Sequence, residues 1–279
     1  MAHSLADWLA LREPFDAAAR SVGLTRAIAD ALPRDRTLHI VDLGTGRGSN
    51  VRYLSPHLPQ PQQWLLVDRD AALLAEVPGA TARVVDSRCA IDTAQMNLGV
   101  LDPVIFEGRH LVTASALLDL VSETWLASLA RHCHTTGAAG LFALTYTGES
   151  RCAPSEPEDD AIRELMNRHQ RSNDKGFGRA AGPDAADVAA RCFSDLGFRV
   201  QRAASDWLLP PEARELQLQL VEGWAEAAHE VAPDQSSTIV GWHTRRIAHI
   251  DAGRSRIVVC HEDLAVWPAA QKITAGRSS

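Results

Sequence analysis

Residues 38 to 50 read Leu38-His39-Ile40-Val41-Asp42-Leu43-Gly44-Thr45-Gly46-Arg47-Gly48-Ser49-Asn50, and they carry the strongest fold signal in the chain. An apolar run typical of a buried strand is followed by an acid and then by glycines at three alternate positions. Glycines gathered where a strand passes into a helix let a ligand approach the backbone closely. The segment therefore predicts a ligand-binding turn between a strand and a helix.

The spacing of this turn separates two kinds of nucleotide-binding protein. A dinucleotide-binding turn has the pattern G-x-G-x-x-G, whose last glycine would fall at Ser49, and it normally has an apolar residue in place of Asp42. The pattern D-x-G-x-G-x-G instead resembles motif I of the class I S-adenosylmethionine-dependent methyltransferases. The resemblance implies S-adenosylmethionine as the methyl donor, S-adenosylhomocysteine as the product and no metal. A nicotinamide-dependent dehydrogenase is the alternative for a glycine-rich turn of this kind.

Strand-like segments continue at the spacing of a layered α/β protein. Residues 64–68 and 82–86 are apolar runs that end in Asp68 and Asp86, and Asp70 caps a helix between them. Further apolar runs complete seven predicted strands: 111–116, 140–146, 198–202 and 256–260. This alternation predicts parallel strands with right-handed crossovers. The resemblance implies a Rossmann-like, doubly wound seven-stranded sheet in the order 3-2-1-4-5-7-6, with an antiparallel last strand.

Helical segments surround this core. In the N-terminal part the pattern predicts one helix over 5–12, a second from Pro14 to Gly23 and a third over 25–32. We expect one methyltransferase domain over residues 1–279, with helical insertions after the fifth strand and between the sixth and seventh. Its parts are a helical cover (1–36), a cofactor-binding core (37–147), a substrate lid (148–182 and 204–251) and a flexible tail (270–279).

The resemblance assigns the cofactor contacts of the first turn. Gly44, Gly46 and Gly48 would lie against the methionine and ribose portions of S-adenosylmethionine, and Asp42 would lie near its ammonium group. Ligands of open α/β sheets bind outside the carboxyl ends of the strands. This rule places Ser115, at the end of the fourth strand, beside the transferred methyl group.

Two further acids complete the predicted cofactor site. By the same resemblance, Asp68 would accept hydrogen bonds from both ribose hydroxyls and Asp86 from the adenine amino group. A single acid at a strand end serves equally well as a helix cap or turn residue. The combination of these acids with the glycine turn favours cofactor binding.

Asp119 and His169 are the predicted catalytic residues. Asp119 follows the fourth strand, where it would steer or deprotonate the substrate; its alternative role is to cap the next helix. Histidine titrates near neutral pH and is a natural general base, although a histidine on an apolar helix face, as at His169, is often a core residue. His243 and His261 also fall in or beside segments that could roof the site.

The residues after the fourth strand restrict the methyl acceptor. Many members of the family that methylate exocyclic or amide nitrogens carry a tetrapeptide [DN]-P-P-[FYW] here, whereas this chain has Thr113-Ala114-Ser115-Ala116. The difference argues against DNA-adenine and glutamine-amide methylation. Oxygen, carbon, sulfur and amine acceptors stay open.

Composition narrows the partners and the compartment. The net charge is −7 and basic residues are not clustered, which disfavours nucleic acid and favours a small-molecule acceptor. No apolar run approaches the roughly 20 residues needed to cross a bilayer, and no secretory signal opens the chain. Five scattered cysteines without a C-x-x-C pair argue against a disulfide framework and a zinc site. We therefore expect a cytoplasmic enzyme without a membrane partner.

Two other functions are compatible with the sequence. One is a methyltransferase of a protein or RNA, which needs a basic entrance. The only arginine-rich face that the sequence offers for it contains Arg163, Arg168, Arg171 and Arg179. The other is a non-catalytic protein that binds S-adenosylmethionine.

Overall fold

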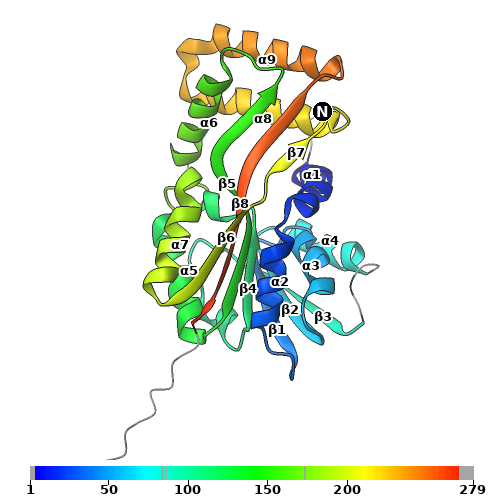
Figure 1. Cartoon of the computed structure of the whole chain (residues 1–279), viewed down its shortest axis with the longest axis vertical. Helices are drawn as coiled ribbons and strands as arrows, with labels where there is room; N and C mark the ends of the chain where they lie inside the picture. Colours follow the sequence, from blue (N-terminus) through cyan, green and yellow to red (C-terminus); the bar gives the residue numbers. More distant parts are fainter. Residues whose placement is uncertain (1–3, 83–84, 86, 173, 270–279) are drawn as a thin grey trace, which may run out of the picture.

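The computed structural model describes residues 4–82, 85, 87–172 and 174–269, and its centre is one eight-stranded sheet (Figure 1). The strands are β1 (Leu38–Leu43), β2 (Gln62–Asp68), β3 (Cys89–Gln95), β4 (Leu111–Ser115), β5 (Ala139–Ala153), β6 (Phe198–Ala204), β7 (Trp207–Leu209) and β8 (Arg256–Pro268). Their order is β3-β2-β1-β4-β5-β8-β6, with β7 paired to β8. The first five strands pair in parallel, and β8 is antiparallel to its neighbours. The expected Rossmann-like order is confirmed, and β7 is an additional short strand.

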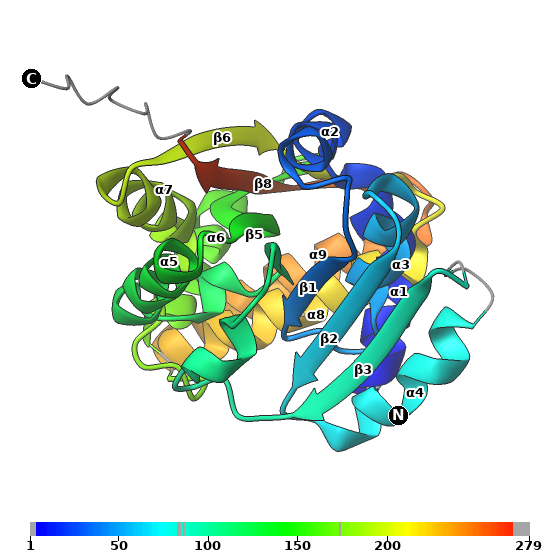
Figure 2. The same cartoon turned by 90° about the horizontal axis from the view of Figure 1, so that it is seen from below.

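Helices cover both faces of the sheet (Figure 2). They are α1 (Leu5–Ala19), α2 (Val22–Ala31), α3 (Ser49–Leu54), α4 (Ala71–Thr81), α5 (Glu123–Thr136), α6 (Asp159–Ser172), α7 (Ala185–Asp195), α8 (Arg214–Val231) and α9 (Ser236–Asp251). Side chains of β1 alternate between the two layers: Val41 and Leu43 join the core beneath α5 and α7, whereas Leu38 and Ile40 join the core beneath α2, α3 and α4. This alternation is the period-two pattern of a strand buried on both sides.

The N-terminal helices differ from the sequence prediction. α1 continues through Pro14, because Trp8, Leu11 and Phe15 recur on one helix face and pack together against the same core. Packing of the whole face outweighs the unfavourable effect of an internal proline. Gly23 does not end a helix; it lies in the first turn of α2.

The third strand also lies later than predicted. α4 extends through Pro78 to Thr81, and β3 occupies Cys89–Gln95 in place of 82–86. β3 is a half-exposed strand at the edge of the sheet, so it needs no continuous apolar run. Asp86 lies outside the described residues, so the adenine contact expected of it stays a prediction.

The two insertions form one helical unit. β5 and β8 extend past the other strands and carry α6, α8 and α9 at one end of the molecule (Figure 1). Leu165 of α6, Trp224 of α8 and Trp242 of α9 share one buried core there, and the apolar face of α1 packs against it. The unit therefore adjoins the helix that covers the carboxyl end of the sheet.

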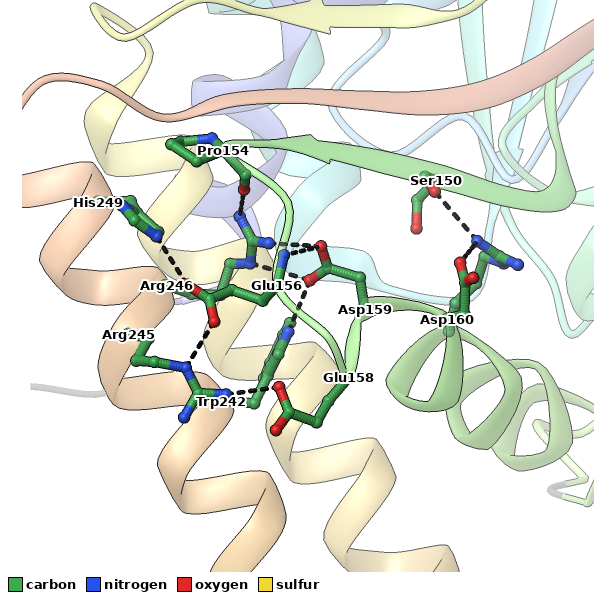
Figure 3. Close-up of polar contacts among 11 residues, drawn as sticks. Ser150, Pro154, Glu156, Glu158, Asp159, Asp160, Trp242, Arg245, Arg246 and His249 are labelled. Atoms are coloured by element: carbon green, nitrogen blue, oxygen red, sulfur yellow. Dashed lines mark hydrogen bonds and ion pairs between the residues drawn. The ribbon is translucent and has the colours of Figure 1, made fainter.

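A buried arginine joins the insertions (Figure 3). Arg246 on α9 has no exposed side-chain surface. Its Nε donates to Asp159 at the start of α6 (3.0 Å), its Nη2 donates to the same carboxylate, and its Nη1 donates to the Pro154 carbonyl oxygen (2.6 Å). Trp242 Nε1 also donates to Asp159 (2.8 Å). This fully bonded charge fixes α9 against α6 and the end of β5.

Candidate functional site

A cavity of about 360 Å³ lies at the carboxyl ends of β1, β2 and β4. Ligands of doubly wound sheets bind at this edge, where the strand order reverses, and cavities of roughly 300–1,000 Å³ are typical of small-molecule sites. α1 contributes much of the opposite wall through Leu5, Trp8, Leu9, Arg12, Glu13 and Asp16. α1 therefore lies over this edge of the sheet.

The three glycines adopt the backbone geometry that their spacing indicates. Gly44, Gly46 and Gly48 have φ values of +66°, +54° and +77°, in the left-handed region that disfavours other residues. A Cβ at Gly46 would stand 3.1 Å from Leu9 Cδ1 on α1. Gly44 and Gly46 line the cavity, whereas Gly48 caps the start of α3. Gly48 thus turns the chain into the helix, and the contact of the first two glycines with a cofactor stays a prediction.

Asp68 closes β2 and stands on the cavity wall. One carboxylate oxygen accepts from the Gly46 amide (2.8 Å), and the other accepts from the Asp70 amide (2.9 Å). The side chain thus fixes the glycine turn and leaves further lone pairs for a ligand. Asp70 accepts from the amides of Ala72 and Leu73 and so caps α4 as predicted.

Asp42 holds the floor of the cavity together. Its Oδ1 accepts from Asn50 Nδ2 (2.6 Å) and from Thr113 Oγ1 (2.7 Å), which joins β1 to α3 and β4. Burial raises the pKa of this carboxyl group, and the hydrogen bond from Thr113 opposes that effect. Asp42 and Asn50 both line the cavity.

The side wall of the cavity next to α4 is apolar. It is formed by Leu73, Leu98 and Phe177, and Phe177 makes an edge contact with Trp125 at 6.1 Å between ring centroids. Phe177 comes from the loop after α6, which Asp174 shapes by accepting from three successive backbone amides. Sequence reasoning missed Phe177 as a site residue, although an Asp before Gly-Phe-Gly is a signal for a shaped loop.

The junction of β4 and β5 carries backbone strain. Ala116 and Leu144 have φ values of +52° and +56°, which non-glycine residues rarely adopt, and the Ala116 amide donates to the Ala143 carbonyl oxygen (2.9 Å). Strain of this kind gathers at functional sites. Ser115 and Ala116 line the cavity at this junction, and the place of Ser115 beside a transferred methyl group stays a prediction.

Asp119 lies directly behind this wall. It is buried in a short turn whose neighbours Leu117 and Leu120 line the cavity, and Gln170 Nε2 stands 3.5 Å from its Oδ2. Burial raises the pKa of Asp119 to about 6. The alternative role as a helix cap belongs to Ser122, which accepts from the Trp125 amide.

The three candidate histidines stand apart from the cavity wall. His169 Nε2 lies 2.8 Å from Glu230 Oε2, between α6 and α8, and His243 Nε2 lies 3.2 Å from Glu222 Oε2. His261 is buried on β8, and its burial lowers its pKa to about 3. The structure therefore does not bring His169 together with the predicted cofactor residues.

The sequence disfavours two other features, a metal site and a helix that spans a membrane. Within the described residues, no group of three His, Cys, Asp or Glu side chains is arranged to hold a metal ion. In the same part of the chain, no helix combines the length and the apolar character that spanning a membrane requires.

Comparisons with known proteins find similarity only in structure. No protein-family model matches the sequence, and no curated protein matches it. The cyclopropane synthase MmaA2 from Mycobacterium tuberculosis shares 10% identity at a TM-score of 0.45, over 87% of this chain and 82% of that one. YcgJ from Bacillus subtilis shares 13% sequence identity at a TM-score of 0.47, over 88% of this chain and 98% of that one. The third is a SAM-dependent methyltransferase from Geobacter sulfurreducens in complex with S-adenosyl-L-homocysteine. It shares 12% sequence identity at a TM-score of 0.45, over 92% of this chain and 98% of that one. At these sequence identities and TM-scores the similarity concerns the fold alone, and it assigns no role to any residue.

Proposed function

We propose that this chain is an S-adenosylmethionine-dependent methyltransferase that acts on a small-molecule acceptor by direct in-line transfer. The observation that carries the proposal is the arrangement of Asp68. Its carboxylate stands on the wall of a cavity at the switch in strand order and is bonded to the middle glycine of the turn. A carboxylate in that position accepts hydrogen bonds from a ribose diol, while the glycine turn leaves room for the adjoining chain of the ligand.

Other residues that line the cavity fit the same cofactor. Leu73, Leu98 and Phe177 offer an apolar slot for an adenine ring, and the buried Asp42 lies at the end of the turn where the amino-acid portion would bind. S-adenosylmethionine supplies an already activated methyl group. The task of the chain is therefore to bind and align the donor and the acceptor, and to exclude water.

Asp119 is the proposed proton acceptor. Its position behind Leu117 and Leu120 places it next to the strained junction, and its pKa of about 6 suits a base that works near neutral pH. His169 is not carried forward in this role, because it pairs with Glu230 outside the cavity wall.

The size and walls of the cavity favour a small acceptor over a macromolecule. α1 and the loop that carries Phe177 both border it. On the alternative arginine-rich face, Arg171 already pairs with Asp184 (3.0 Å) and Arg163 with Asp160 (2.7 Å), which reduces the positive charge available to a nucleic acid. We propose the insertions 148–182 and 204–251 as the substrate lid, since one of them supplies Phe177.

Replacement of Asp68 tests the proposal. In Asp68→Asn we expect S-adenosylhomocysteine to bind roughly 10 to 100 times more weakly in titration calorimetry, because hydrogen bonds to a charged group are worth about 1.5–3 kcal/mol. Asparagine keeps the size of the side chain and one acceptor oxygen for the glycine turn. Asp92→Asn, an exposed change on β3, is the matched control and should bind like the wild type.

Two results would contradict the proposal. One is unchanged binding of S-adenosylhomocysteine by Asp68→Asn. The other is tighter binding of NAD than of S-adenosylhomocysteine by the wild type, which would favour a dehydrogenase. Binding without turnover across a panel of metabolites would instead favour the non-catalytic alternative.

A further inference from the structure

A second cavity of about 360 Å³ adjoins the first beneath α1. It lies among the C-terminal half of α1, α3 and the turn Ser55–His57. The two cavities have five wall residues in common: Glu13, Asp16, Ser49, Arg52 and Ser115. A molecule in the second cavity would therefore meet a cofactor in the first at the end of β4.

Arg20 lines this second cavity and is incompletely bonded. Its side chain is 3% exposed, and Nη1 donates to Asn50 Oδ1 (2.8 Å). Nε and Nη2 are buried and have no hydrogen-bond partner among the residues that the structure describes. The ring of Tyr53 lies against the guanidinium, 4.5 Å from its carbon atom. Buried charged donors without acceptors are unfavourable and uncommon, so their presence beside a cavity indicates a missing partner.

The nearest carboxylate does not supply that partner. Asp263 Oδ2 is 3.9 Å from Arg20 Nε, which is beyond hydrogen-bond range. Its two oxygens accept instead from the backbone amides of Ser21 (2.8 Å) and Leu144 (2.9 Å). Asp263 therefore balances the charge of Arg20 from a distance and leaves its donors open.

The acids on the cavity wall already have cationic partners. Glu13 forms a two-point pair with Arg52 (2.7 and 2.5 Å), and Asp16 forms one with Arg12 (2.9 and 3.2 Å). In each pair the negative charge of the acid is balanced by the positive charge of its arginine. Arg20, by contrast, has two buried donors that these acids do not satisfy.

We propose that Arg20 binds a carboxylate group in the second cavity through Nε and Nη2. These two donors form one edge of the guanidinium, which matches the two oxygens of a carboxylate. The inference rests on the proposed function, because the carboxylate has two possible sources. It is either the amino-acid end of the methyl donor or part of a methyl acceptor that is a small carboxylic acid.

A pair of cofactor fragments distinguishes the first source. S-adenosylhomocysteine carries the amino-acid group, whereas 5′-methylthioadenosine has the same adenosine and sulfur without it. If Arg20 holds the cofactor, Arg20→Gln should bind S-adenosylhomocysteine at least tenfold more weakly and methylthioadenosine equally well in calorimetry. Arg20→Lys keeps the charge and loses the two-point geometry, so it should lose affinity and also serves if the glutamine variant does not fold.

Benzoate and acetate test the second source. If Arg20 holds an acceptor acid, one of them should bind wild-type protein saturated with S-adenosylhomocysteine, and both Arg20 variants should lose this binding with unchanged cofactor affinity. Arg26→Gln, an exposed change on α2, is the control. The inference is overturned if neither the affinity ratio of the two fragments nor acid binding depends on Arg20. Failure of both fragments to bind the wild type would instead overturn the proposed function.

Discussion

Two buried arginines in different regions of the molecule have opposite bonding states. Arg246, in the helical insertions, uses all three of its nitrogens: two bond to Asp159 and one to a carbonyl oxygen. Arg20, at the C-terminal end of α1, bonds through one nitrogen, and its other two have no partner in the described part of the chain. A buried charge that the protein satisfies itself belongs to its architecture, whereas one left open beside a cavity is available to a ligand.

The largest expected effect comes from removing the satisfied charge. Arg246→Met leaves Asp159 without its cationic partner, and loss of one member of a buried pair typically costs about 3–5 kcal/mol. We expect a decrease of this size in the free energy of unfolding measured with urea. Arg245→Met on the same helix is the control: its side chain is 42% exposed, so its pairs with Glu156 and Glu158 should contribute much less to the free energy of unfolding.

The same measurement on Arg20 sharpens the contrast. Arg20→Met removes the hydrogen bond to Asn50 and the cation nearest the buried Asp263, but it also removes two unsatisfied donors, so we expect a smaller loss than for Arg246→Met. Equal losses for Arg20→Met and Arg246→Met would show that the open donors of Arg20 do not set it apart. If Arg246→Met lowers the free energy of unfolding by less than about 1 kcal/mol, the hydrogen bonds of Arg246 do not hold the insertions together.

The sheet around these charges could be predicted because its signals are local. The apolar run before Asp42 and the glycines after it depend only on neighbouring residues, and both appear at the predicted positions. β3 was misplaced because an edge strand is half-exposed and lacks a continuous apolar run. The prediction of the adenine contact at Asp86 depended on that strand.

The site could be predicted only where it belongs to the sheet. Asp42, Asp68 and Ser115 follow from strand ends, and all line the cavity. Phe177 lies more than 100 residues beyond Asp68 in the sequence and reaches the same cavity through the loop after α6. The bonding state of Arg20 depends on Asn50 and Asp263, which only tertiary packing brings near it. Such long-range relations leave no periodic pattern in the sequence.

Asp119 gives a test with an effect of intermediate size. A buried carboxyl group without strong partners can lose its charge by protonation. Its folded pKa of about 6 lies above the ordinary value of 3.8. Between these values the folded state binds more protons than the unfolded state, so this group makes the protein less stable as the pH rises from about 4 to 6. Asparagine does not titrate. The stability of Asp119→Asn relative to the wild type should therefore rise by roughly 2–3 kcal/mol between pH 4 and pH 7.

Urea unfolding at four pH values measures this difference. Asp160→Asn on α6, whose side chain is 81% exposed, is measured beside it as a surface control for the loss of one carboxylate. A difference for Asp119→Asn that does not change with pH would mean that Asp119 is ionised in the folded protein throughout. It would then lack the pKa that suits the proposed proton acceptor.

The smallest expected effect concerns a charge pair that solvent reaches. His169 pairs with Glu230, whose side chain is 66% exposed, and exposed pairs contribute about 0–1 kcal/mol. We expect His169→Gln to unfold within about 1 kcal/mol of the wild type and to bind S-adenosylhomocysteine with unchanged affinity, because the histidine lies outside the cavity wall. Glu230→Gln should give the same small change, since both replacements break one contact. A tenfold loss of cofactor affinity in His169→Gln alone would contradict this expectation and would place the histidine at the site. Charged groups on the surface of the insertions would then also count among those that serve a ligand.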